Sequence, residues 1–214
     1  MTFKLKAENL GKAYYSRKYI FSGFNFELAP SEVVALIGKN GSGKTTLLKT
    51  LAGLLHPTAG RVLFLVDGKP VNGDMLHSYF GFVAPYMQLY EEFTPDELIR
   101  LYSMMKTKKV STSRANQLLE LFGLAEFRKE PIRNCSPGMK QRMKFVLCFA
   151  SESDVIFLDE PFSNLDAEGI ELVKSCISDL VSEGKTSVVI ATNDEREMQL
   201  CRRWVDLKSL AAAC

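Results

Sequence analysis

The sequence predicts an α/β fold: a core of buried strands and helices, an antiparallel β subdomain at the N-terminus, and a helical subdomain inserted at about residues 90–150. Short, wholly apolar runs at 33–37 and 155–158 are typical of strands buried on both faces of a sheet. Between about 95 and 150, apolar residues instead recur at helical spacing. We expect residues 1–214 to form a single domain.

Local patterns place the individual elements along the chain. A turn-like stretch separates the first two strands, and a helix from about Lys44 to Ala52 is closed by Gly53. A second long helix is expected over 167–181. The expected strands, in chain order, are 3–10, 20–28, 33–37, 61–66, 79–83, 155–158, 187–191 and 204–207.

The composition excludes several classes of protein. A net charge of +2 gives no strong attraction to nucleic acid, so none is expected as a partner. Five scattered cysteines without a CxxC pair, together with two histidines, favour neither a disulfide framework nor a zinc site. We find no signal peptide, and no apolar run approaches the ~20 residues that span a bilayer. A cytoplasmic protein is expected, which would reach a membrane only through a partner.

The most specific motif is GKNGSGKT at 38–45, which fits G-x-x-x-x-G-K-[ST] between a predicted strand and a predicted helix. Its glycines let backbone N–H groups point at phosphate oxygens, and the helix adds the positive end of its dipole. Lys44 can reach the β- and γ-phosphates, and the Thr45 hydroxyl can bind Mg²⁺. We therefore predict ATP and Mg²⁺ as ligands. The predicted phosphate-binding residues are Gly38, Lys39, Asn40, Gly41, Ser42, Gly43, Lys44, Thr45 and Thr46.

A second motif, Asp159-Glu160-Pro161, ends the buried run at 155–158. The carboxyl end of such a strand is where open α/β sheets place ligands. Asp159 would hold Mg²⁺ directly or through water, and Glu160 would orient or deprotonate the attacking water. An acidic turn at the end of a core strand is a common alternative, but the phosphate loop favours the catalytic interpretation. A small kinase with the same loop is the other possible enzyme, although a water-activating Glu160 favours hydrolysis.

These motifs and the segment between them resemble the ABC ATPase family over nearly the whole chain, which implies a P-loop NTPase core of the RecA-like type. The family signature LSGGQ corresponds to CSPGM at 135–139, in which Ser136 and Gly138 match. SNLD at 163–166 is similar to the family D-loop, SALD. The resemblance implies a dimer in which each ATP lies between one phosphate loop and the partner's Ser136 and Gly138.

Three further residues are assigned through this resemblance. Tyr14 resembles the aromatic residue that stacks on adenine, with Tyr15 as the alternative. The family places a Gln near the end of the strand at residue 83, and Gln88 is the candidate here, with a predicted Mg²⁺ contact. Asn193 replaces the family's switch His; its amide can donate to the γ-phosphate but cannot carry a proton as imidazole can. We therefore expect an ATPase that is slow alone.

The resemblance also implies a transporter subunit powered by ATP-driven dimerisation, as a homodimer or paired with another ABC chain. A transmembrane permease subunit would dock on residues 86–99, from Tyr86 to Ile99, a segment unusually apolar for a solvated loop. Internal packing is the alternative for this segment. The protein would then lie at the inner face of the cell membrane. A soluble ABC ATPase, for example in metal-cluster assembly, and a degenerate cassette paired with another ABC chain are the alternative functions.

Overall fold

The computed structural model describes residues 3–14, 18–71, 73–106, 110–184 and 186–208. Its strands are β1 (Phe3–Ala13), β2 (Tyr19–Leu28), β3 (Val33–Ile37), β4 (Ala59–Val66), β5 (Lys69–Pro70), β6 (Phe80–Val83), β7 (Val155–Asp159), β8 (Ser187–Thr192) and β9 (Arg203–Asp206). Its α-helices are α1 (Lys44–Leu51), α2 (Pro95–Met105), α3 (Thr112–Leu121), α4 (Pro137–Phe149), α5 (Ala167–Ser182) and α6 (Glu195–Met198). Short 3₁₀ helices lie at Gly73–Ser78, Ala125–Phe127 and Ile132–Asn134.

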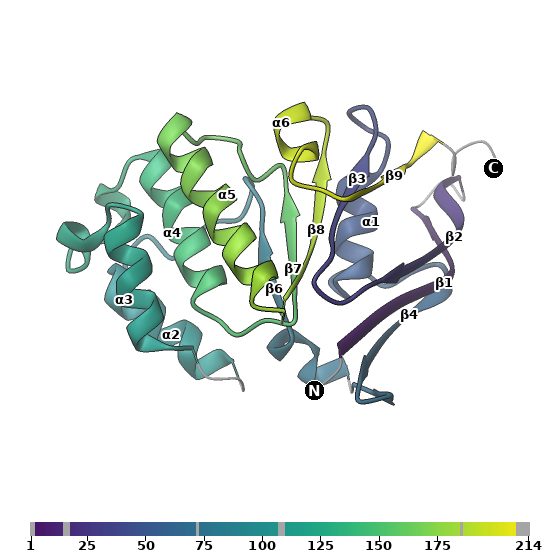
Figure 1. The fold of residues 1–214 in the computed structure, drawn as a ribbon, viewed down its shortest axis with the longest axis horizontal. Helices are drawn as coiled ribbons and strands as arrows, with labels where there is room; N and C mark the ends of the chain where they lie inside the picture. Colours follow the sequence, from purple (N-terminus) through teal and green to yellow (C-terminus); the bar gives the residue numbers. More distant parts are fainter. Residues whose placement is uncertain (1–2, 15–17, 72, 107–109, 185, 209–214) are drawn as a thin grey trace.

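Two sheets make up the β structure. Five parallel strands form the central sheet in the order β6-β7-β8-β3-β9, and an antiparallel sheet has the order β2-β1-β4-β5. In Figure 1 the antiparallel sheet lies on one side of the central sheet, and helices α2, α3 and α4 lie on the other. The predicted fold class is confirmed.

Alternating residues of the central strands face two separate cores. In β8, Val188 and Ile190 belong to the core shared with α4 and α5, whereas Val189 and Ala191 belong to the core shared with α1 and the antiparallel sheet. This is why the apolar runs of β3, β7 and β8 are unbroken: both faces of the central sheet are covered. Helix α1, which follows the phosphate loop, packs in the second of these cores through its buried leucines.

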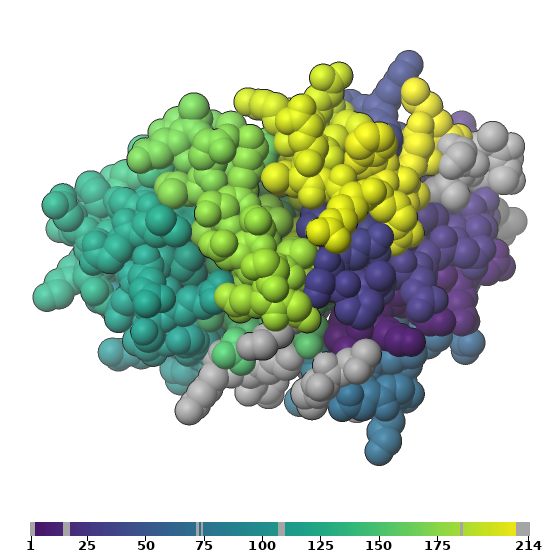
Figure 2. All heavy atoms as spheres, in the orientation of Figure 1, coloured from purple at the N-terminus to yellow at the C-terminus, as the bar shows by residue number. Residues whose placement is uncertain are grey.

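Local signals explain why the helical part begins where it does. Thr94 caps α2 by accepting a hydrogen bond from the Glu97 N–H, and the Glu97 carboxylate accepts one from the Thr94 N–H, a reciprocal capping box with Pro95 in the first turn. Helices α2 to α4 bury their apolar faces in one core with α5. In Figure 2 the atoms of this part gather at one end of the molecule, next to α5.

Element boundaries differ from the predicted ones where strand pairing decides them. The first strand runs to Ala13 rather than residue 10, because Ala13 still pairs with Tyr19 of β2 after a shift in register. The last strand, β9, begins one residue earlier than predicted and pairs with β3. The short elements β5 and α6 were not predicted, since two to four residues carry too little periodicity. None of the helices in the described parts of the chain is long and apolar enough to cross a membrane.

Candidate functional site

The carboxyl ends of the parallel strands bring the predicted site residues to one edge of the central sheet. Ile37, the last residue of β3, pairs with Thr192 of β8, and Asp159, the last residue of β7, pairs with Ala191 of β8. The phosphate loop, Glu160 and Asn193 therefore follow three adjacent strands. This edge is at the top of Figure 1, where the loop before α1 and helix α6 both lie. Such an edge is the usual ligand site of open α/β sheets.

The phosphate loop folds around the Lys44 side chain. Lys44 is buried, and its Nζ donates to the carbonyl oxygens of Gly38, at 2.9 Å, and Lys39, at 3.2 Å. Gly43 begins α1 without any side-chain cap, and no acidic residue lies in the first turn. The first N–H groups of this helix are thus left without a side-chain acceptor, and they carry the positive end of its dipole. An anion at this terminus would supply the missing acceptors.

One further feature of the loop fits a phosphate ligand, and another explains its glycine. The Ser42 hydroxyl is buried, and within the described residues it has no hydrogen-bond partner. Gly43 has a φ of 95°, and a Cβ atom there would overlap the Ile20 side chain. The loop therefore needs glycine at this position to pass close to β2, because other residues are strained at positive φ and would clash.

The second motif combines a buried carboxylate with a strained backbone. Asp159 is 2% exposed, and its Oδ2 accepts a 3.0 Å hydrogen bond from the Tyr86 hydroxyl. Burial, followed by the charge of Asp159 and this hydrogen bond, raises the pKa of Tyr86 far above its usual range, so the phenol stays a donor. Glu160 has a φ of 45°, and its N–H donates to the Ala191 carbonyl at 2.9 Å. A left-handed conformation at a non-glycine residue costs about 1–3 kcal/mol, and such strain is common at functional sites.

Asn193 reaches the phosphate loop across the sheet edge. Its Nδ2 donates to Asn40 Oδ1 at 2.9 Å. The two residues are 153 positions apart in the sequence, yet the β3–β8 pairing makes them neighbours. An amide donor thus stands beside the loop that is predicted to hold the nucleotide phosphates.

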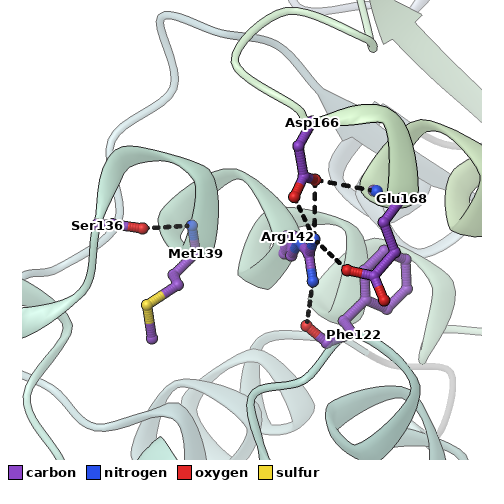
Figure 3. A network of polar contacts seen from close by, with 7 residues as sticks. Phe122, Ser136, Met139, Arg142, Asp166 and Glu168 are labelled. Carbon is purple, nitrogen blue, oxygen red and sulfur yellow. Dashed lines mark hydrogen bonds and ion pairs between the residues drawn. The ribbon is translucent and has the colours of Figure 1, made fainter.

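The predicted signature residues lie at the start of α4. Ser136 is the N-cap, and its Oγ accepts from the Met139 N–H at 3.2 Å (Figure 3). Ser136 is exposed. A Cβ atom on Gly138 would lie 3.6 Å from the Asn164 carbonyl oxygen, so the signature and the segment at 163–166 adjoin.

Arg142 links α4, the helix that begins at the predicted signature residues (the signature helix), to α5. Its guanidinium donates to both carboxylate oxygens of Asp166, at 2.8 and 3.1 Å, to Glu168 at 3.2 Å, and to the Phe122 carbonyl at 3.1 Å (Figure 3). Asp166 is also the N-cap of α5 and accepts from the Gly169 N–H. All the bonds from Arg142 to the two carboxylates come from one guanidinium nitrogen, Nη2, and they are charge-assisted. The orientation of α4 is thereby set relative to the segment that follows Glu160.

The remaining predicted residues are less closely gathered. Tyr14 is 47% exposed at the end of β1, with the Lys12 ammonium 5.3 Å from its ring centroid, and Tyr15 lies outside the described residues. Gln88 is exposed, and it is Tyr86 from the same loop that contacts Asp159. Sequence reasoning missed this contact. The available signal was the hydroxyl group of Tyr86, two residues before Gln88, but from the sequence Tyr86 is interpreted only as part of an apolar docking surface.

Two oxygen-bearing side chains at this edge have the chemistry to hold a magnesium ion that arrives with a nucleotide. In the part of the chain that the structure describes, no group of three or more His, Cys, Asp or Glu side chains could hold a metal ion. Mg²⁺ is commonly bound by one or two protein oxygens together with substrate phosphates. The Asp159 carboxylate and the Thr45 hydroxyl, in the first turn of α1, supply such oxygens.

Glu197 is a buried acid that sequence reasoning also missed. It lies on α6, is 2% exposed, and its Oε1 accepts a 2.7 Å hydrogen bond from the Phe162 N–H. It therefore joins the loop after β8 to the loop after β7. Burial raises its pKa from 4.5 to about 7, against the hydrogen bonds from Thr192 and Phe162, and the nearby charges of Asp194 and Glu160 add to the increase.

Glu197→Gln is expected to reduce the pH dependence of stability. Because the folded-state pKa of about 7 lies above the ordinary value of 4.5, the stabilisation by the neutral carboxyl is complete below pH 4.5 and is lost as pH rises through 7. As pH rises through this range, the free energy of unfolding of the wild type should fall by on the order of 3 kcal/mol because of this group, and that of the Gln variant should not. Urea unfolding between pH 5 and 8 measures the difference. Glu195→Gln, an exposed change on the same helix, is the control, and an equal slope for all three proteins would contradict the expectation.

Comparison with known proteins gives matches along most of the chain. A protein family described as ABC transporter matches residues 21–163. The putative hemin import ATP-binding protein HrtA of Staphylococcus aureus is 33% identical over 211 residues, covering 94% of this chain and 93% of that protein. The lipoprotein-releasing system ATP-binding protein LolD of Buchnera aphidicola is 31% identical over 202 residues, covering 89% of this chain and 88% of its own length.

Solved structures give the same result. The dimeric structure of an ATP-binding cassette in a post-hydrolysis state, bound to ADP and Pi, has a TM-score of 0.81 at 26% identity and covers 94% of this chain and 93% of that chain. The ATP-binding subunit of an ABC transporter has a TM-score of 0.83 at 26% identity, covering 94% and 85% respectively.

Proposed function

Because the chain belongs to the ABC transporter family of ATP-binding cassettes, we propose that it is the ATPase subunit of a membrane transporter and that two cassettes associate around ATP. It is an ATPase by family, and one of its structural neighbours holds the products ADP and Pi. The observation that carries the residue assignments is the convergence of Lys44, Asp159, Glu160 and Asn193 at one sheet edge.

In this proposal, different residues at the sheet edge bind the phosphates, activate the attacking water and hold the magnesium ion. The loop amides and Lys44 bind the phosphates, and the Asn193 amide donates to a γ-phosphate oxygen. Glu160 orients the attacking water and accepts its proton, a role typically worth ~10²–10⁴ in rate. Thr45 and Asp159 would hold Mg²⁺, which neutralises phosphate charge when bound. Gln88, exposed in the loop after β6, would contact the ion only after that loop moves.

Dimerisation is supported by where the signature residues lie. Ser136 and Gly138 stand at the exposed N-terminus of α4, a position that can meet the γ-phosphate of a nucleotide on a second cassette. Arg142 holds this helix against the loop that follows Glu160. Closing two cassettes around ATP and separating them after hydrolysis would alternate the transporter between two states. The second cassette can be another copy of this chain or a different ABC chain.

A permease is proposed to dock beside residues 86–99. Tyr86, Met87, Tyr90 and Phe93 are exposed there, at 50%, 37%, 68% and 38%. Next to them lies an apolar groove of about 330 Å³, lined by Lys49, Leu54, His77, Phe80, Phe82, Tyr86, Met87, Tyr102, Met105 and Lys106. Large exposed aromatic and Met side chains around a groove are typical of a protein-binding surface. We propose that a helix from the cytoplasmic side of a membrane subunit binds here, which would place this chain at the inner face of the membrane.

The Glu160→Gln protein tests the transporter assignment. Mass spectrometry of what copurifies with it, from gently solubilised cells containing ATP, is expected to find a stoichiometric polytopic membrane protein. Finding only soluble partners, such as metal-cluster assembly factors, would move the chain to the non-transport cassettes. The cargo is chosen by the membrane subunit, so its identity would follow from the same experiment.

Asn193→Ala is expected to slow hydrolysis without abolishing ATP binding. The change removes an amide donor at the phosphate loop, and losing one donor to developing charge costs about 10²-fold in kcat. Asn193→His keeps a donor and adds a group that can carry a proton, so it should match or exceed the wild type. Phosphate release under saturating ATP measures both. Unchanged turnover in the two variants would exclude Asn193 as a γ-phosphate contact.

A further inference from the structure

Tyr86 links the candidate nucleotide site to the apolar groove through a single side chain. At one end its hydroxyl donates to Asp159 Oδ2 at 3.0 Å. At the other, its ring lines the groove and is covered by the Lys49 ammonium, 4.2 Å from the ring centroid. Lys49 belongs to α1, the helix that begins at the phosphate loop. The phenol is thus held between β7 and α1 although it belongs to neither.

The backbone that carries Tyr86 is fixed from a third element. Lys144 of α4 is buried, and its Nζ donates to the carbonyl oxygens of Pro85 at 3.1 Å and Ala84 at 3.3 Å. Its other acceptor is the Gln141 side chain, at 3.1 Å. A buried ammonium is costly unless it is hydrogen-bonded, so these contacts resist displacement. The signature helix therefore anchors the two residues that immediately precede Tyr86.

We propose that Tyr86 is a positioning residue for Asp159, which fixes the orientation of this carboxylate toward the divalent cation. The inference rests on the proposed role of Asp159 as a cation ligand. Carboxylates that bind metals are themselves held by hydrogen bonds, and removing such a partner typically weakens metal binding by about 10- to 100-fold. Tyr86 suits this role because a phenol has two side-chain torsions, its ring lies against the Lys49 ammonium, and the carbonyl of the preceding residue, Pro85, accepts from Lys144.

Tyr86 lies in the segment where the sequence departs from the family pattern. No Gln stands at the end of β6 itself, and Tyr86, two residues before the candidate Gln88, supplies a phenol hydroxyl to Asp159. The same ring forms part of the groove wall. A segment of a partner protein bound in the groove would therefore contact Tyr86, the side chain that donates a hydrogen bond to the proposed cation-binding carboxylate of Asp159.

The experiment measures cation affinity separately from turnover. Mn²⁺ is titrated into the protein with bound ADP, and free Mn²⁺ is followed by electron paramagnetic resonance. Tyr86→Phe removes the hydroxyl and keeps the ring, whereas Tyr90→Phe removes an exposed hydroxyl from the same loop. Asp159→Asn removes the proposed ligand charge. Affinity for a fluorescent ADP in EDTA and thermal unfolding by circular dichroism report on nucleotide binding without metal and on folding.

Tyr86→Phe is expected to weaken Mn²⁺ binding about tenfold or more, with ADP affinity in EDTA unchanged and Tyr90→Phe equal to the wild type. Wild-type or tighter Mn²⁺ affinity in Tyr86→Phe, alongside weakened binding in Asp159→Asn, would overturn the positioning role alone. If Asp159→Asn binds Mn²⁺ as the wild type does, the assignment of Asp159 is wrong, and the role of Tyr86 falls with it. Equal losses of Mn²⁺ and ADP affinity in Tyr86→Phe would indicate general damage and would also overturn the proposal.

Discussion

Replacing Lys44 by alanine is expected to remove nearly all ATP binding. Lys44 is the buried cation of the phosphate loop, and its Nζ is held by two loop carbonyls that a phosphate can replace as the stronger partner. Losing a buried, charge-paired donor costs about 2–5 kcal/mol, or ~30-fold to several thousand-fold in affinity. The nucleotide-induced rise in unfolding temperature gives the simplest measurement, because a ligand at 100 times its Kd stabilises a protein by about 2.7 kcal/mol.

The control for this variant is Lys69→Ala, the same change at an exposed residue of β5, the edge strand of the antiparallel sheet. It should keep the full ATP-induced rise. Without ATP, the Lys44→Ala protein should unfold near the wild-type temperature, since alanine removes a buried charge that has only carbonyl partners. An undiminished ATP response in Lys44→Ala would mean that the nucleotide binds elsewhere.

The parts of the site that the sequence predicts are those carried by local chemistry. A phosphate loop consists of consecutive residues, because each one supplies a backbone conformation or an amide N–H to the same turn. It can therefore be recognised from the sequence. The acidic pair at 159–160 is also predictable from neighbouring residues, since the fully apolar run before it predicts a buried strand and therefore the position of its carboxyl end. Pairing of β3, β7 and β8 then brings the two motifs together, which the α/β pattern implies before any coordinates are known.

The contacts that the sequence does not predict join residues distant along the chain. Tyr86 and Asp159 are 73 residues apart, and Lys144 reaches Pro85 across 59. Nothing local marks a phenol as the donor to a particular carboxylate, because the pairing depends on how the loop after β6 folds back over β7. Glu197 is a similar case. Its sequence context, in a helix of four residues, gives no sign of burial, yet its side chain is buried and accepts a hydrogen bond from the Phe162 N–H. Such polar contacts are set by topology rather than by composition.

Replacing Glu160 by glutamine is expected to stop hydrolysis while preserving ATP binding. Glutamine keeps the shape of the side chain and the strained backbone at φ 45°, but it cannot accept a proton from water. Turnover should fall by ~10²–10⁴, the usual contribution of a general base. Because the nucleotide is no longer consumed, the two-cassette state should accumulate. Light scattering coupled to size exclusion in Mg-ATP should then report a dimer that reverts to monomer when ADP replaces ATP.

Glu152→Gln makes the same chemical change at an exposed position before β7 and should leave both turnover and the monomer–dimer balance unaltered. The ATP-trapped dimer also depends on the signature helix, so adding Ser136→Arg to Glu160→Gln should prevent dimerisation without preventing ATP binding, because a bulky charge would block the exposed N-terminus of α4. A Glu160→Gln protein that stays monomeric and hydrolyses ATP at the wild-type rate would contradict both the assignment of Glu160 as the base and the association of two cassettes around ATP. Loss of turnover in a protein that remains monomeric would retain the base and exclude only the association, so the two halves of the mechanism can fail separately.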